Sequence, residues 1–276
     1  MNKKNEPVCV TGANGFIGSW LVRTLIDHGY THINASIFPD SDALSQAIQG
    51  CSGVFHVASP CTLDDPSDPI NDLINPPYRA RSTSSTPPAL PASLALSSLP
   101  PSPRSSRKKW YPVSKTLAEK AAWEFGEKHG IDIVAIHPST CLGPLLQSSL
   151  NASCAVLQQL LRGSADGQEY HWLGAVHVKD VAEAQVLLFE TPTASGRYLC
   201  TNGIYQFREF AEKVAQLFPQ FPIHRFQEDT QPGMMSCDAA SKRLIELGVK
   251  FTPIEETICD TVTSLKARGF LEEQQT

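Results

Sequence analysis

Two residues four positions apart have the types and spacing of an acid–base pair. Tyr111 and Lys115 belong to the run Tyr-Pro-Val-Ser-Lys, and this spacing places them on one face of a helix. Pro112 is compatible with the first turn of that helix, where no backbone donor is lost. A free tyrosine has a pKa of about 10, but a neighbouring ammonium group stabilises the phenolate and lowers that pKa. The pair therefore predicts a phenol that gives its proton to a carbonyl oxygen as hydride arrives.

A glycine-rich loop near the start of the chain supplies the second chemical signal. Residues 11–18 read Thr-Gly-Ala-Asn-Gly-Phe-Ile-Gly, between an apolar strand pattern and a helix pattern. In this context the first glycine permits a tight turn, the second lets the backbone approach a pyrophosphate, and the third allows close helix packing. The first N–H groups of the helix attract phosphate. We expect a dinucleotide to be bound by Gly12, Gly15, Phe16, Ile17 and Gly18.

The cofactor is expected to be NADP, as NADPH, rather than NAD. An acidic residue about 20 positions after the loop would bind the ribose of NAD. Asp40 is the nearest candidate, but its distance from the loop fits poorly and an ordinary turn aspartate is the better reading. Lys115 is expected to contact the nicotinamide ribose as well as to tune the phenol. For the glycine loop, the alternative reading is a purely structural turn. For Tyr111 and Lys115, the alternative is a spacing that arises by chance.

Composition narrows the classes of partner. The 276 residues are 41% hydrophobic, enough for a substantial core, and the net charge is −5 with a pI of about 5.9. That charge argues against nucleic acid and anionic membranes, and no apolar run approaches the roughly 20 residues of a membrane helix. The eight cysteines form no C-x-x-C pair, so no metal site is expected. The start of the chain resembles no signal peptide, and we expect a cytoplasmic location.

Apolar runs and helical periodicities alternate along the chain. Strands are predicted at 8–10, 33–38, 54–57, 131–136 and 197–200. Helices are predicted at 14–28, 43–49, 111–130, 152–161, 180–189, 207–218, 239–247 and 254–268. This order indicates an α/β fold, a Rossmann-type doubly wound parallel sheet that is incomplete, followed by a smaller, mainly helical lobe. We divide it into an NAD(P)-binding domain at 1–145 and a substrate-binding lobe at 146–276.

Residues 76–107 break this alternation. They contain eight prolines, nine serines and no acidic residue. Proline at this density opposes both helices and central strands, so we expect an irregular or disordered insert.

Several longer motifs carry a resemblance to a known family. They are Val-Phe-His-Val-Ala-Ser-Pro at 54–60, His-Pro-Ser-Thr-Cys-Leu-Gly-Pro at 137–144, Val-His-Val-Lys-Asp-Val-Ala at 176–182 and Ser-Gly-Arg-Tyr-Leu at 195–199. With the glycine loop and the Tyr–Lys pair, these motifs resemble the extended short-chain dehydrogenase/reductases. Among them the match is to the plant group around cinnamoyl-CoA reductase and dihydroflavonol 4-reductase, over about residues 7–75 and 108–271.

The resemblance implies further cofactor contacts. Val57 and Ala58 would line the adenosine side, and Pro138 and Thr140 would lie near the nicotinamide. His56 and His137 have two open readings, direct chemistry or hydrogen-bonded core histidines at strand ends. The segment 177–182 would begin a helix of the substrate lobe, and we read its polar residues His177, Lys179 and Asp180 as a solvated helix start.

The chain departs from this family in three places. Around Tyr111 the family's cinnamoyl-CoA reductases have asparagine followed by Trp-Tyr-Cys-Tyr, which indicates a reductase-like relative here. Gly18 and Phe55 are only 37 positions apart, which indicates a deletion near residue 40. The family's strand ending in Thr-Ser-Ser, one serine of which polarises the substrate carbonyl, has no counterpart in residues 76–107, and no serine is assigned to that role.

A frame-shifted reading is our hypothesis for residues 76–107. Read two bases later, with codons chosen among those permitted, residues 76–102 give a helix, a glycine turn and an apolar strand ending in Thr-Ser-Ser. Sequencing the transcript through residues 40–110 tests this, and an intact reading frame as printed would reject it.

The residues thus favour an NAD(P)-dependent oxidoreductase that reduces a small aromatic carbonyl compound, of the phenylpropanoid or flavonoid kind, with impaired activity. One alternative is a nucleotide-sugar epimerase-like enzyme, which shares the loop and the Tyr–Lys pair. The other is a catalytically inactive nucleotide-binding module, which the absent serine strand would favour.

Overall fold

The computed structural model describes residues 3–36, 46–58, 92–95, 110–165, 172–226 and 237–272, with backbone only at 3, 92–95, 110–115 and 237–238. The chain divides into two compact units. The first comprises Met1–Ser98, Arg107–His137 and Ala182–Tyr198, and the second comprises Leu99–Ser106, Pro138–Val181 and Leu199–Thr276.

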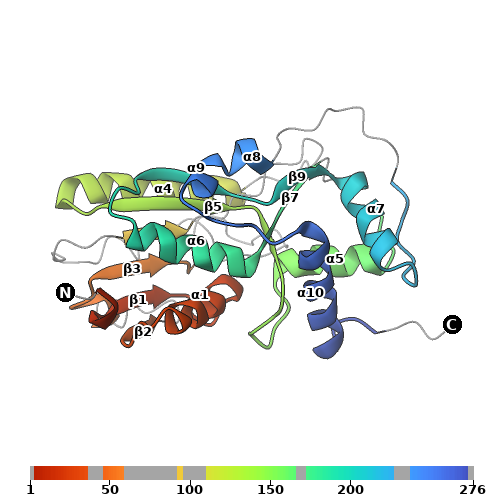
Figure 1. The fold of residues 1–276 in the computed structure, drawn as a ribbon, viewed down its shortest axis with the longest axis horizontal. Helices are drawn as coiled ribbons and strands as arrows, with labels where there is room; N and C mark the ends of the chain where they lie inside the picture. Colours follow the sequence, from red (N-terminus) through yellow and green to blue (C-terminus); the bar gives the residue numbers. More distant parts are fainter. Residues whose placement is uncertain are drawn as a thin grey trace. The chain divides into compact units, whose positions relative to one another are not determined.

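A six-stranded sheet forms the centre of the first unit (Figure 1). Its strand order is β2-β1-β3-β4-β5-β8, and every pairing from β2 through β5 is parallel. The strands are β1 (Val8–Thr11), β2 (Ile33–Ser36), β3 (Gly53–His56), β4 (Ala92–Ala95), β5 (Ile133–Pro138) and β8 (Gly196–Cys200). The order runs outward from β1 in both directions, so the doubly wound fold expected from the sequence is confirmed.

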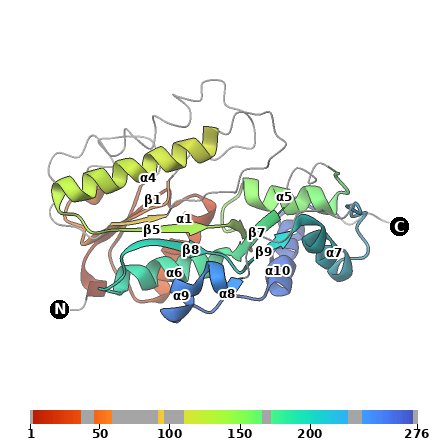
Figure 2. The same ribbon diagram turned by 90° about the horizontal axis from the view of Figure 1, so that it is seen from above.

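Helices cover both faces of this sheet. On one face, α1 (Phe16–Asp27) and the part of α6 (Val178–Glu190) within the unit pack on β1 and β3. The buried apolar cluster between these helices and strands includes Leu21, Leu25, Val186 and Phe189. On the other face, Ala122 of α4 (Trp110–His129) packs against Ile133 of β5. Figure 2 shows α4 running along the strands on the side opposite α6. The apolar periodicity of α1 and α4 is therefore explained by burial against the sheet.

Strand β4 corrects one expectation from the sequence. Residues 92–95 pair in parallel with β3 on one side and β5 on the other, so for these four residues the predicted irregular insert is wrong. The run Ala-Ser-Leu-Ala follows Pro91 and contains no proline, so each residue can donate its backbone N–H to a neighbour. Two buried strands with unpaired edges favour any proline-free segment between them. The remaining residues of 76–107 lie outside the described part of the chain.

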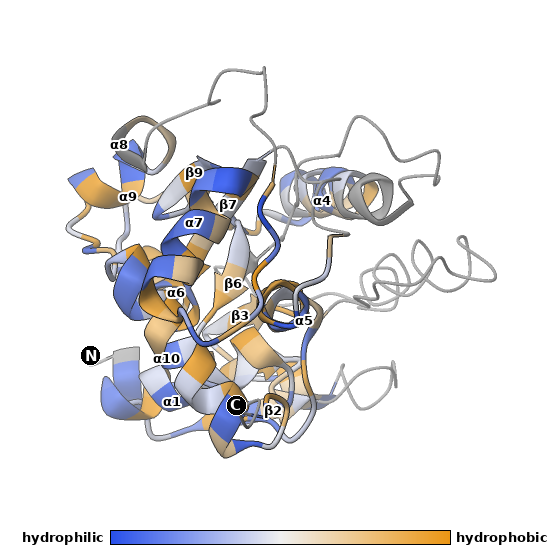
Figure 3. Ribbon diagram, turned by 90° about the vertical axis from the view of Figure 1, so that its right-hand side faces the viewer, coloured by the Kyte–Doolittle hydropathy of each residue, from blue (hydrophilic) through white to orange (hydrophobic). Residues whose placement is uncertain are grey.

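The second unit has its own sheet. β6 (Thr140–Leu142) is parallel to β7 (Trp172–His177), which is antiparallel to β9 (Gly203–Gln206). Helices of the unit contact these strands, among them α5 (Ala152–Leu161), α7 (Phe207–Leu217) and α10 (Ile254–Ala267). Figure 3 shows both hydrophilic and hydrophobic residues on α7, whose apolar side chains Phe207, Phe210 and Val214 are buried. The helices match the predictions closely, whereas the sequence analysis did not find these three strands.

The predicted helix at 239–247 is divided in two. The structure has α8 (Cys237–Ala240) and α9 (Lys242–Glu246), separated at Ser241. Ser241 is fully buried, and its hydroxyl donates to the carbonyl oxygen of Thr201 at 2.8 Å while accepting the N–H of Thr201 at 2.9 Å. These bonds fix Ser241 to the strand segment after β8, which explains the interruption.

The other short elements agree with the sequence where they are described. A 3-10 turn, η1 (Lys3–Asn5), precedes β1. The predicted helix at 43–49 is helical at 46–48, and residues 43–45 lie outside the described part. No helix within the described ranges is both long and apolar enough to cross a membrane.

We expect Phe55→Ala to destabilise the first unit by about 3–5 kcal/mol, the usual cost of removing a buried phenylalanine ring. Phe55 has no exposed surface, and its ring centroid lies 5.0 Å from that of Phe189. Urea unfolding gives the free energy. Ile26→Ala is the control, because Ile26 is 55% exposed and should change stability by only about 0.5 kcal/mol. Equal losses in the two variants would contradict this account of the core.

Candidate functional site

The glycine loop connects the end of β1 to the start of α1. Gly12 has a φ of +68°, and its N–H donates to the carbonyl oxygen of Ser36 at 2.8 Å. The N-cap of α1 is Gly15, which has no side chain to cap the helix. The first N–H groups of α1 are therefore not satisfied by a cap, and the predicted residues Phe16 and Ile17 are its first two. A helix start of this kind can bind an anion.

Two of the three loop glycines are required by the packing. A Cβ on Gly12 would lie 2.8 Å from the Cα of Ala58, and a Cβ on Gly18 would lie 2.0 Å from the carbonyl oxygen of Gly12. Gly15 differs, because its φ is −80° and its nearest neighbour would be the Gly12 oxygen at 3.2 Å. The fold thus explains Gly12 and Gly18, whereas Gly15 fits a backbone that must leave room for a phosphate group.

Thr11 joins this loop to the end of β3. Its hydroxyl accepts the N–H of Ala58 at 3.2 Å and lies 2.9 Å from Nδ1 of His56. Thr11 and His56 are also register partners of the parallel β1–β3 pair. Of the two predicted adenosine contacts, Ala58 is buried and Val57 is half-buried. These residues lie at the carboxyl ends of β1 and β3, where the strand order reverses and ligands of such sheets bind.

The Tyr–Lys pair lies in the first turns of α4. The helix begins at Trp110, so Tyr111 and Lys115 share one face as predicted, and Gly130 follows the last residue with a φ of +64°. The side chains of these two residues lie outside the described atoms. The next residue on this face, four positions after Lys115, is Glu119.

Glu119 takes part in a cluster that the sequence analysis did not find. Its carboxylate is only 10% exposed and accepts the Trp123 Nε1–H at 3.1 Å and the Arg197 Nε–H. Nε2 of His137, at the end of β5, lies 3.6 Å away. Burial alone would raise the pKa of Glu119, but the hydrogen bonds from Trp123 and Arg197 outweigh it and keep the pKa below its ordinary value. The helical spacing from Tyr111 was the available signal for Glu119.

His137 is held mainly in its neutral form. Burial lowers the pKa of His137 below 6.5, and the nearby Glu119 carboxylate opposes this only in part. Its Nε2 is buried and has no hydrogen-bond partner within the described residues. His56 is bonded to Thr11, so it fits the reading of a hydrogen-bonded histidine at a strand end.

The two remaining predicted contacts lie in the second unit. Pro138 is the buried last residue of β5, and Thr140 begins β6. Thr140 is 2% exposed, and its hydroxyl finds no hydrogen-bond partner in the described part of the chain. A buried hydroxyl of this kind usually has a partner, which a ligand could supply.

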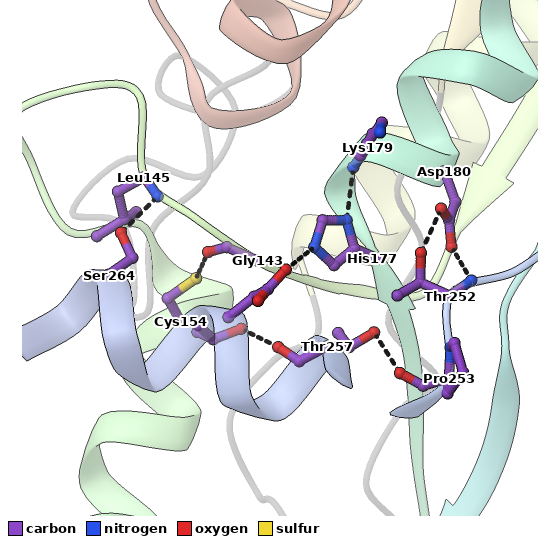
Figure 4. A network of polar contacts seen from close by, with 12 residues as sticks. Gly143, Leu145, Cys154, His177, Lys179, Asp180, Thr252, Pro253, Thr257 and Ser264 are labelled. Carbon is purple, nitrogen blue, oxygen red and sulfur yellow. Dashed lines mark hydrogen bonds and ion pairs between the residues drawn. The ribbon is translucent and has the colours of Figure 1, made fainter. Parts of the chain in front are cut away.

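The reading of His177 and Asp180 as a solvated helix start is wrong. Both are buried, and only Lys179 of the three is exposed. Figure 4 shows His177 accepting the Lys179 N–H on Nδ1 and Asp180 accepting from Thr252. Asp180 accepts both the N–H and the hydroxyl of Thr252, at 2.7 and 2.8 Å. The two bonds between Asp180 and Thr252 therefore fix the start of α6 to the segment before α10.

Among the described residues, neither reactive thiols nor grouped metal ligands form a candidate site. Six cysteines with described side chains are free, and burial raises the pKa of the Cys9 and Cys154 thiols to about 12. In the described ranges no three His, Cys, Asp or Glu side chains are grouped so that they could hold a metal ion.

The sequence matches the NAD dependent epimerase/dehydratase family over residues 8–75 and 81–200. The chain therefore belongs to this family, and it is an NAD(P)-dependent oxidoreductase of the extended short-chain dehydrogenase/reductase type. Within that type it belongs with the reductases similar to cinnamoyl-CoA reductase and dihydroflavonol reductase.

The curated and solved relatives cover nearly the whole chain. Cinnamoyl-CoA reductase 1 of Petunia hybrida is 35% identical, over 96% of this chain and 94% of its own. Vestitone reductase from alfalfa (Medicago sativa L.) has a TM-score of 0.75 at 26% identity, covering 97% of this chain and 100% of its own. The yeast methylglyoxal/isovaleraldehyde reductase Gre2, complexed with NADPH, has a TM-score of 0.76 at 22% identity, covering 96% and 100%, and supports the fold alone.

This chain is shorter than its petunia relative within the aligned region. The alignment spans 313 positions, whereas 96% of 276 residues is about 265, so about 48 positions have no counterpart here. The deletion expected near residue 40 stays a prediction, and Asp40 lies outside the described residues.

We expect Gly15→Ala and Gly18→Ala to fail in different ways. The Gly18 variant should lose about 3 kcal/mol or more of stability, because its Cβ overlaps the Gly12 carbonyl. The Gly15 variant should lose about 1 kcal/mol or less but should bind NADPH more weakly. Urea unfolding measures the first effect, and a fluorescence titration with NADPH measures the second. Unchanged NADPH affinity in Gly15→Ala would reject the loop as the phosphate site.

The stability of the first unit should fall as the pH drops below about 6.5. The folded-state pKa of His137 is depressed, so the unfolded chain binds more protons below its own pKa of about 6.5. Stability is thus fully present above that pH and is lost as the pH falls toward the folded value. His137→Gln should weaken this dependence between pH 7.5 and 5.5, measured by urea unfolding. The same substitution at exposed His32 is the control, and parallel curves for wild type and His137→Gln would contradict the assignment.

Proposed function

We propose that this chain is an NADPH-dependent reductase of a small aromatic carbonyl compound, related to the phenylpropanoids and flavonoids. The supporting observation is one arrangement in the first unit. The glycine loop lies at the carboxyl end of β1, and α4, which carries Tyr111 and Lys115, packs on the same parallel sheet. A phosphate cradle and an acid–base pair on one sheet suit hydride transfer coupled to proton transfer.

Each proposed residue has a defined task. Gly12, Gly15 and Gly18 admit the pyrophosphate, and the N–H groups at Phe16 and Ile17 bind it. Val57 and Ala58 line the adenosine side, and Lys115 holds the nicotinamide ribose. Pro138 and Thr140 are assigned near the nicotinamide, an assignment that the unpartnered Thr140 hydroxyl supports.

The chemistry follows from these positions. When bound, the nicotinamide cofactor would supply hydride to the carbonyl carbon. Tyr111 donates its phenolic proton to the carbonyl oxygen, and the Lys115 ammonium lowers the pKa of that phenol toward neutrality. Without the donor, the negative charge that develops on oxygen has no proton to neutralise it.

The assignment of one domain to the cofactor and one lobe to the substrate, and the substrate class, are inferred from the relatives. The predicted cofactor domain at 1–145 and substrate lobe at 146–276 remain part of this proposal. An aromatic carbonyl substrate is inferred from the names cinnamoyl-CoA reductase and vestitone reductase. NADPH is preferred over NAD in the proposal, because no acidic residue at the expected distance from the glycine loop is assigned to the ribose of NAD. Measured turnover separates the proposed reductase from the epimerase-like and inactive alternatives.

We expect weak turnover in the wild-type chain, because no serine is assigned to polarise the carbonyl. Loss of one such donor typically costs about 10²–10³ in kcat. Strand β4 pairs with both β3 and β5, so the expected weakness rests on the unassigned serine and not on a gap between these two strands.

Tyr111→Phe should lower kcat by about 10²–10⁴, the range for loss of a general acid, while NADPH binding stays close to wild type. The ring keeps its shape and loses only the transferable proton. NADPH oxidation on a panel of cinnamoyl-CoA, aldehyde and dihydroflavonol substrates measures turnover, and NADH in parallel tests the cofactor preference. Equal turnover in wild type and variant would overturn the assigned mechanism, and conversion of a nucleotide sugar without net NADPH loss would favour the epimerase alternative.

A further inference from the structure

We propose that Gln147 and Asn151, in the loop between β6 and α5, recognise a hydroxyl group on the ring of an aromatic ligand that the second unit binds. The inference deepens the proposed function and rests on its substrate class. It names the two residues of this unit that would select among such ligands. Neither residue is assigned a role in cofactor binding or in proton transfer.

The side-chain amide of Gln147 supplies the first observation. Its Nε2 and its Oε1 are both covered from solvent, and neither atom has a hydrogen-bond partner in the described part of the chain. Interchanging the nitrogen and the oxygen, the usual ambiguity of an amide, satisfies neither position. A buried amide normally has partners, because leaving it without them destabilises the fold. Gln147 therefore calls for a partner that the protein itself does not supply.

Asn151 shows the same feature four residues later. It is the N-cap of α5, a position at which the oxygen of an asparagine side chain normally accepts an N–H of the first helical turn. Here the side chain makes no cap bond, and Oδ1 is buried without a hydrogen-bond partner among the described residues. Three unpartnered polar atoms thus lie within residues 147–151.

The backbone that precedes these two amides is firmly held. The Leu145 N–H donates to the Ser264 hydroxyl of α10 at 2.9 Å, as Figure 4 shows, and the Leu145 carbonyl oxygen accepts from Arg268 at 2.8 Å. Gly143 has a φ of +134°, and a Cβ on it would lie 2.9 Å from Cγ1 of Val178. The loop is therefore anchored to α10 and to the start of α6, which gives its side chains the rigid support that recognition requires.

The chemistry of the loop suits a hydroxyl on an apolar ring. A hydroxyl both accepts and donates, so it can accept from Nε2 of Gln147 and donate to Oδ1 of Asn151. Two leucines flank the amides, Leu146 at 41% exposure and Leu150 half-buried, and they offer apolar contact to a ring. Residues 143–151 contain no charged side chain, which favours a neutral group over a carboxylate or a phosphate.

The Gln147 amide can reach a ligand at little cost. Gln147 and Asn151 are half-buried residues of a connecting loop, and no hydrogen bond holds the Gln147 amide inward. Turning that amide toward a ligand therefore breaks no bond and forms the bonds that it lacks. The group is unfavourable in the free protein and becomes favourable only in the complex.

This arrangement predicts opposite effects of Gln147→Met on stability and on binding. Methionine has a similar length and no amide, so the free variant should melt about 2–4 °C higher than wild type. Its affinity for 4-hydroxycinnamaldehyde should fall about 3–10-fold, the range for one neutral hydrogen bond. Its affinity for cinnamaldehyde, which lacks the ring hydroxyl, should stay unchanged. Scanning fluorimetry gives the melting temperature, and calorimetric titration in NADP⁺, where no hydride is transferred, gives the affinities.

Two further variants separate recognition from a structural role. Asn151→Ser keeps a residue type that caps helices, and it should weaken only the binding of 4-hydroxycinnamaldehyde, without loss of stability. Gln158→Met is the matched control, because Gln158 is 8% exposed and its amide donates to the carbonyl oxygen of Phe270. That variant should melt at a lower temperature and should keep the wild-type preference between the two aldehydes.

The outcomes distinguish this inference from the proposed function. Unchanged affinities in Gln147→Met, equal losses for the two aldehydes, or no binding of either aldehyde to wild type would each overturn the inference. A selective loss for 4-hydroxycinnamaldehyde supports it even if NADPH oxidation is absent, a result that would instead count against the reductase. Where turnover is measured, Gln147→Met should raise KM for the hydroxylated aldehyde and leave kcat close to wild type.

Discussion

The close backbone approach at Gly12 is the constraint on which the first unit depends. The Cα side of Gly12 packs against Ala58 at the end of β3, and its carbonyl oxygen leaves no room for any side chain at Gly18. One turn thus fixes β1, β3 and α1 against one another. The Thr11 hydroxyl strengthens this junction by accepting the Ala58 N–H. Because the helix start must come this close to the strand ends, its uncapped N–H groups are left at the edge where a dinucleotide would bind.

The second fixed point is the underside of α4. A helix packed on a sheet by Ala122 and Ile133 alone could slide or rotate, since apolar contacts are not directional. The Glu119 carboxylate adds directional bonds to Trp123 and Arg197. The bond from Arg197 ties the helix that carries Tyr111 to β8, and the bond from Trp123 holds the carboxylate within the helix. The anchored carboxylate lies eight residues, or about two helical turns, after Tyr111 in the same helix.

Local patterns predicted some parts of the structure well and others not at all. The strand, loop and helix at 8–27 were predictable because a short apolar run, three glycines and a 3.6-residue periodicity all lie within one window. β4 was not, because its four residues are held by two neighbouring strands and have little strand character of their own. The second sheet was missed for a similar reason, since β7 and β9 are paired across 25 residues or more of sequence. Glu119, His137 and Arg197 come from three separate segments, and only the first follows from the spacing of Tyr111.

Each unit contains a buried thiol whose reactivity depends on how often that unit opens. Cys9 lies in the middle of β1, and Cys154 lies in α5 of the second unit, both without exposed surface. A thiol must ionise and be reached by a reagent before it reacts, and neither condition is met while these two remain packed. The rate at which each becomes alkylated in the native protein therefore reports how often that unit opens. The two rates, compared by mass spectrometry, would show whether the units unfold as one cooperative body or as two.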